Sequence, residues 1–87
     1  MNLQNKKALV TGSARGIGRG CALELARAGA DVIVNDRQSS ASAEAVVAEI
    51  EALGRQAVLV EGDVFEASSC EQVVQRVIAA FGRIDIL

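Results

Sequence analysis

Three glycines near the amino terminus have the spacing of a phosphate-binding loop. Gly12, Gly16 and Gly18 lie in segment 11–18, Thr-Gly-Ser-Ala-Arg-Gly-Ile-Gly, which follows the strand-like run 8–10 and precedes a helix-forming segment. Because glycine has no Cβ, the backbone can turn sharply there, approach a ligand closely and pack the next helix against the strand. Backbone N–H groups at a helix start also attract anions. The segment therefore predicts a site for the pyrophosphate of a dinucleotide.

The spacing also separates kinds of nucleotide site. The pattern Gly-x-x-x-Gly-x-Gly differs from the Gly-x-Gly-x-x-Gly fingerprint, and it lacks the Gly-Lys-Ser/Thr of a P-loop. A nucleoside triphosphate is therefore not the expected ligand. Two alternatives stay open here: an ordinary glycine-rich turn, and an S-adenosylmethionine-dependent methyltransferase, whose glycine run is usually denser.

An acidic residue ends the next strand-like segment. Asp36 lies about twenty residues beyond the glycine loop, where an acid can accept hydrogen bonds from both ribose hydroxyls of an adenosine. Its alternative interpretation is a turn former at the end of a strand. A 2′-phosphate near this carboxylate would be repelled. Asp36 therefore favours NAD over NADP.

The glycine loop after a first strand resembles the short-chain dehydrogenase/reductase family, and the resemblance covers residues 6–87. The resemblance implies an oxidoreductase that interconverts a small-molecule alcohol and a carbonyl compound with NAD or NADP. Within the family, the chain is similar to 3-oxoacyl-carrier-protein reductases and to sugar dehydrogenases. In that family an Asp followed by an apolar residue after the third strand contacts the adenine, which implies this role for Asp63 and Val64. Arg15 and Arg37 stand where NADP-preferring members carry basic residues, so NADP stays possible beside the favoured NAD.

The candidate cofactor-binding residues come from three segments of the chain. They are Gly12, Ser13, Arg15, Gly16, Ile17, Gly18, Asp36, Arg37, Asp63 and Val64.

The catalytic residues of the resembled family fall outside this chain. The family carries an Asn-Asn-Ala-Gly turn and then a Ser and a Tyr-x-x-x-Lys pair, whereas this chain contains no Tyr. We therefore assign no catalytic residue and expect residues 1–87 to be one partial dinucleotide-binding domain, the amino-terminal half of a longer enzyme and inactive alone. A dinucleotide-binding sensor or scaffold without catalysis is the alternative.

Alternating strand and helix patterns must position these residues. Short segments rich in Val, Ile and Leu predict strands, and apolar residues three or four apart predict helices. The expected strands are 7–11, 31–36, 57–63 and 84–87. The expected helices are 16–28, 42–53 and 68–81, the last opening with a Ser68-x-x-Glu71 capping box.

This alternation predicts an α/β fold. Strands joined by helices are parallel and have right-handed crossovers, which gives a Rossmann-type doubly wound sheet, here its first half. The expected strand order is 3-2-1-4, with the ligand at the carboxyl ends of the strands, between the first and fourth strands where the winding of the chain reverses.

Composition excludes several other classes. The chain has 87 residues, a net charge of −2, no His and two Cys. A zinc site would have too few ligands. The sequence also lacks the stripe of basic residues that is typical of a nucleic-acid-binding protein. The longest apolar run, 77–81, is far shorter than the about twenty residues of a membrane span. We expect Cys21 and Cys70 to be small buried residues rather than a disulfide or metal pair. We also expect a cytoplasmic location and, for the longer enzyme, a homo-oligomer.

Overall fold

The computed structural model describes residues 2–37, 40–64 and 66–86. Strands and helices alternate along these residues. They are β1 (Lys7–Val10), α1 (Gly16–Arg27), β2 (Asp31–Asp36), α2 (Ala41–Ala52), β3 (Ala57–Glu61) and α3 (Ala67–Phe81). The strands are parallel and pair in the order β1-β2-β3, which confirms the predicted α/β class.

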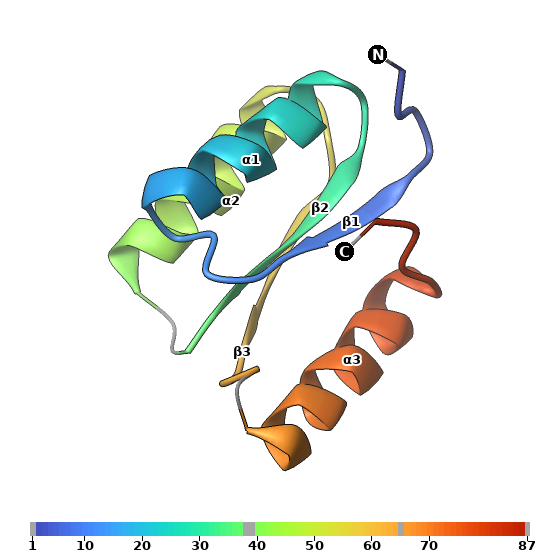
Figure 1. Cartoon of the computed structure of the whole chain (residues 1–87). Coiled ribbons are helices and arrows are strands. Elements are labelled where there is room, and N and C mark those ends of the chain that lie inside the picture. The colour runs from blue at the N-terminus through green and yellow to red at the C-terminus, as the bar shows by residue number, and fades with distance from the viewer. Residues whose placement is uncertain (1, 38–39, 65, 87) are drawn as a thin grey trace.

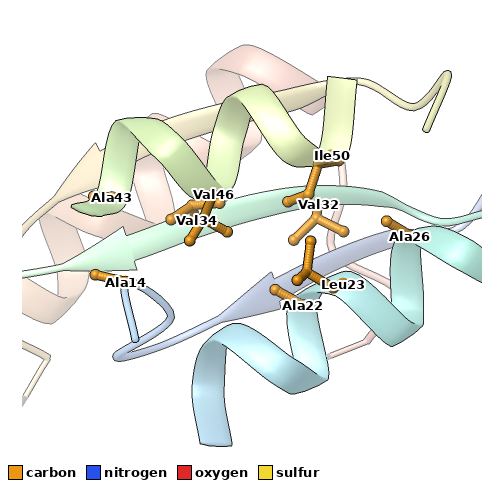
Figure 2. Close-up of a cluster of buried hydrophobic side chains, with 9 residues drawn as sticks. All are labelled: Ala14, Ala22, Leu23, Ala26, Val32, Val34, Ala43, Val46 and Ile50. Carbon is orange, nitrogen blue, oxygen red and sulfur yellow. The ribbon is translucent and has the colours of Figure 1, made fainter. Parts of the chain in front are cut away.

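The sheet is covered by helices on both faces, with α1 and α2 on one face and α3 on the other (Figure 1). β2 lies between the other two strands and sends alternate side chains to the two faces. Val32 and Val34 pack against α1 and α2, and Figure 2 shows this cluster. Ile33 packs on the other face with Val73 and Val77 of α3. Because both faces are covered, the middle of β2 is apolar without interruption.

The helices begin and end close to the predicted positions, but the predicted capping of one helix is wrong. The hydroxyl of Ser40 caps α2 by accepting the N–H of Ala43 at 3.1 Å. The predicted capping box of α3 is wrong, because the N-cap residue is Glu66 and its side chain makes no capping bond. The hydroxyl of Ser68 instead donates to the carboxylate of Glu66 at 3.0 Å.

The predicted fourth strand is present only as an isolated bridge. Ile86 bridges Ala8 in parallel, accepting the N–H of Leu9 at 2.9 Å and donating to the carbonyl of Lys7 at 3.0 Å. These bonds lie on the edge of β1 opposite β2, so the position agrees with the order 3-2-1-4. Leu87 lies outside the described residues. β1 and β3 are also shorter than predicted, ending at Val10 and Glu61 rather than at residues 11 and 63.

Candidate functional site

The loops that follow the three strands enclose a pocket of about 470 Å³, which we call the strand-end pocket. This volume lies within the range of about 300–1,000 Å³ that is usual for small-molecule sites. The strand-end pocket brings together five of the ten predicted residues from three separate loops. Its lining residues are Thr11, Gly12, Asn35, Asp36, Arg37, Gly62, Asp63 and Val64.

The start of α1 leaves its backbone donors available. Its N-cap residue, Arg15, gives no side-chain capping bond, and the first turn contains no acidic residue. Gly16 opens the helix at φ +63°, a left-handed conformation that favours glycine. A Cβ added at Gly18 would overlap the carbonyl oxygen of Gly12. The loop therefore folds back closely on the helix and leaves a helix start that suits an anion.

Two buried polar residues tie the glycine loop to the neighbouring strands. Ser13 and Asn35 are 0% and 1% exposed. The N–H of Ser13 donates to the carbonyl of Asn35 at 3.0 Å, and the N–H of Asn35 donates to the Ser13 hydroxyl oxygen at 3.1 Å. The Ser13 hydroxyl in turn donates to the carbonyl of Val10 at 2.8 Å. Ser13 thus holds the loop through its own N–H and hydroxyl rather than presenting them to the pocket.

Sequence reasoning missed Asn35, whose amide extends this network to β3. Its Nδ2 donates to the carbonyls of Val60, at 2.8 Å, and of Gly62, at 3.4 Å. One side chain therefore joins the ends of β2 and β3, and its backbone joins both to the glycine loop. The available signal was an amide inside an otherwise apolar strand, where burial requires hydrogen-bond partners.

Asp36 and Arg37 line a second pocket as well, of about 320 Å³, which we call the Arg15 pocket. Its other lining residues are Ala14, Arg15, Ser40 and Ser42. The N–H of Arg37 donates to Oδ1 of Asp36 at 2.7 Å, which orients the carboxylate. The Arg37 guanidinium forms an ion pair with Oδ2 of Asp63 at 3.3 Å.

The remaining predicted residues lie elsewhere. Ile17 and Gly18 line a third, mostly apolar pocket of about 670 Å³, which we call the apolar pocket and which Val64 also borders. Ile17 is 88% exposed. Cys21 and Cys70 line the same pocket, and the expectation of two buried cysteines is wrong, since Cys21 is exposed and Cys70 is half-buried.

Neither a metal cluster nor a membrane-spanning helix occurs in the described part of the chain. Residues 2–37, 40–64 and 66–86 contain no group of three or more His, Cys, Asp or Glu side chains that could hold a metal ion. Within the same residues, no helix has the length and apolar character needed to cross a membrane.

Comparisons with known proteins give a consistent result. The family model described as short chain dehydrogenase matches residues 6–87. Over 85 residues the chain is 51% identical to a hydroxynaphthalene reductase of Aspergillus fumigatus, covering 98% of this chain and 31% of that protein. It is 42% identical over 85 residues to an L-rhamnose 1-dehydrogenase (NAD(P)(+)) of a Sphingomonas species, covering 98% of this chain and 34% of the relative.

A solved structure is similar over the same extent. The crystal structure of a hydroxysteroid dehydrogenase from Escherichia coli superposes with a TM-score of 0.90 and 36% sequence identity, covering 99% of this chain and 36% of that one. The chain therefore spans about a third of the length of the curated relatives that it matches.

Proposed function

Because the chain belongs to the short-chain dehydrogenase family, we propose that it forms the dinucleotide-binding half of an NAD(P)-dependent oxidoreductase that interconverts an alcohol and a carbonyl compound. The observation that carries the proposal is the strand-end pocket, where the glycine loop meets Asp36 and Asp63. The names of the relatives, a reductase and a dehydrogenase, support the reaction class. Their greater length supports placing the catalytic groups outside these residues.

The residues present fit a dinucleotide. The uncapped start of α1 and the loop before it offer N–H groups for a pyrophosphate, and the loop is held in place by Ser13 and Asn35. Asp36 would accept hydrogen bonds from the ribose hydroxyls, and Asp63 with Val64 would contact the adenine. When bound, the nicotinamide group supplies or accepts the hydride. The part played by this chain is to bind and orient the cofactor.

We propose NAD as the preferred cofactor and NADP as the second. Asp36 supports NAD because its carboxylate, fixed by the N–H of Arg37, would repel a 2′-phosphate. Arg15 and Arg37 support NADP, since both line the Arg15 pocket next to Asp36. The name of the rhamnose dehydrogenase includes both cofactors.

Replacing Asp36 by Ala tests this choice. In the full-length protein that carries these residues, the wild type should bind NADH more tightly than NADPH, and Asp36→Ala should narrow or reverse the preference. Fluorescence titration with both cofactors measures it. A tenfold preference of the wild type for NADPH, about 1.4 kcal/mol, would show that the arginines outweigh Asp36.

Titration with S-adenosylmethionine beside both dinucleotides, together with an activity assay, separates the alternatives. Binding of S-adenosylmethionine without either dinucleotide would favour a methyltransferase. Dinucleotide binding without turnover of any alcohol or carbonyl compound by the full-length protein would favour a sensor.

A further inference from the structure

Arg37 lies where the two pockets beside Asp36 meet. It lines the strand-end pocket together with Asp63, and it lines the Arg15 pocket together with Arg15. Its guanidinium is 3.3 Å from the carboxylate of Asp63. The guanidinium is thus paired with a carboxylate of the strand-end pocket, while Arg37 also borders the Arg15 pocket.

The Arg15 pocket has the chemistry of an anion site. The hydroxyl residues Ser40 and Ser42 line it together with Arg15. A ribose held by Asp36 would direct a 2′-phosphate toward this neighbourhood, and the phosphate would have to overcome repulsion from the Asp36 carboxylate. Two guanidiniums offset that repulsion better than one. The position of Arg37 therefore affects how tightly a 2′-phosphate can bind.

We propose that Asp63 determines cofactor preference through Arg37. The ion pair holds the guanidinium of Arg37 away from a 2′-phosphate, and the intact pair therefore disfavours NADPH. This inference rests on the proposed function and adds a specificity-determining role to Asp63. The pair is exposed, with side-chain exposures of 70% for Arg37 and 31% for Asp63, and exposed pairs contribute little energy. We therefore expect a shift of about two- to fivefold.

The variant Asp63→Asn tests the inference in the full-length protein. It keeps the size of the side chain and removes the charge that attracts Arg37. The ratio of the NADPH and NADH dissociation constants, measured by fluorescence titration, should fall about two- to fivefold. A lost adenine contact would weaken both cofactors equally and leave the ratio unchanged. Asp63→Ala provides a second variant with the same expected direction.

Two further variants isolate the role of Arg37. In an Arg37→Ala background, Asp63→Asn should no longer change the ratio. Glu24→Gln is the matched control, because it removes one carboxylate from another exposed ion pair, with Arg27 on α1, outside all three pockets. It should leave the ratio unchanged.

Three results would overturn the inference. An unchanged ratio in both Asp63 variants would show that the ion pair does not restrain Arg37. The same shift in the Arg37→Ala background would show that Asp63 repels the phosphate directly. Absence of binding of either dinucleotide to the wild type would overturn the proposed function and, with it, this inference.

Discussion

Gly18 and Gly16 are glycines for different physical reasons, and substitution should separate them. A Cβ at Gly18 would overlap the Gly12 carbonyl oxygen and lie 3.1 Å from the Cα of Ser13, backbone atoms that cannot move aside independently. Gly18→Val should therefore lose about 1–3 kcal/mol of unfolding free energy, measured by urea denaturation, together with dinucleotide binding. At Gly16 a Cβ meets no atom within 4 Å, but φ is +63°. Gly16→Val should lose binding and keep its helical circular dichroism.

Gly20 provides the control for this pair. It lies on the same helix, where an added Cβ also meets no atom within 4 Å. Gly20→Val should keep both folding and dinucleotide binding. Unchanged affinity in Gly16→Val would instead show that this part of the loop does not approach the pyrophosphate.

At the candidate site, the proximity of two residues was predictable from their spacing in the sequence. The loop glycines and Asp36 have a recognisable distance along the chain, and the structure brings Gly12 and Asp36 into one pocket. Asn35 was not predictable in this way, because its role depends on carbonyls of a strand about 25 residues later. The inward orientation of Ser13 likewise depends on a residue distant in the sequence, Asn35.

At the scale of elements, an ion pair joins β1 and β2, and we predict that it makes their pairing sensitive to pH. Lys7 and Asp31 are register partners, with Nζ and Oδ2 2.6 Å apart. Burial raises the pKa of Asp31, but hydrogen bonds from Lys7 and from the N–H of Gln56 outweigh it and hold the pKa below its usual value. A lowered folded-state pKa adds stability above the unfolded pKa, about 3.9, which is lost as pH falls through the folded pKa.

The expected outcome is a loss of unfolding free energy below about pH 4 that depends on Asp31. Urea denaturation at a series of pH values measures it, and Asp31→Asn should flatten the acid side of the profile. Asp85→Asn is the comparison: Arg83 and the N–H of Lys7 lower the pKa of Asp85 as well, but that carboxyl is solvent-screened and its effect should be smaller. A profile of Asp31→Asn with the wild-type slope would show that the pair contributes nothing to the pairing of β1 with β2.

Predicting elements from the sequence succeeded where apolar periodicity controls the structure and failed where polar groups compete. The six described strands and helices fall within the predicted segments apart from one residue at each start of α2 and α3. The fourth strand is described only as far as the bridge at Ile86, and just before it the Asp85 carboxylate accepts the N–H of Lys7 at 2.9 Å. The start of α3 was misread because Ser68 bonds to Glu66 rather than to the backbone.

At the scale of the whole molecule, the two faces of the sheet differ in how completely they are covered. The face under α1 and α2 carries the larger buried cluster. On the other face, α3 leaves Val74 and Ile78 39% and 44% exposed. The apolar pocket lies between α1, β1 and α3 and is bordered by Ile17, itself 88% exposed. The apolar pocket and the exposed apolar side chains beside it, Ile17 and Val74, favour association with another polypeptide.

We therefore predict that the 87-residue chain by itself self-associates and shows no turnover. Burying an aliphatic side chain contributes about 1.5–3 kcal/mol, a large share of the about 5–15 kcal/mol that stabilises a small domain. Sedimentation velocity should show oligomers, and an NADH oxidation assay with a panel of carbonyl compounds should stay at background. Val74→Lys, at the border of the apolar pocket, should reduce association. Leu53→Lys is the matched control, since Leu53 is 42% exposed and lies at the end of α2, outside that pocket.

Different results would contradict the predicted self-association and the predicted absence of turnover. A wild-type chain that sediments as a monomer would show that the apolar pocket is too small or too well hydrated to drive association. Equal effects of the two lysine variants would assign the association to general surface hydrophobicity rather than to the pocket. Turnover above background would show that a proton donor exists among these residues, because moving a hydride between an alcohol and a carbonyl compound also requires transfer of the hydroxyl proton.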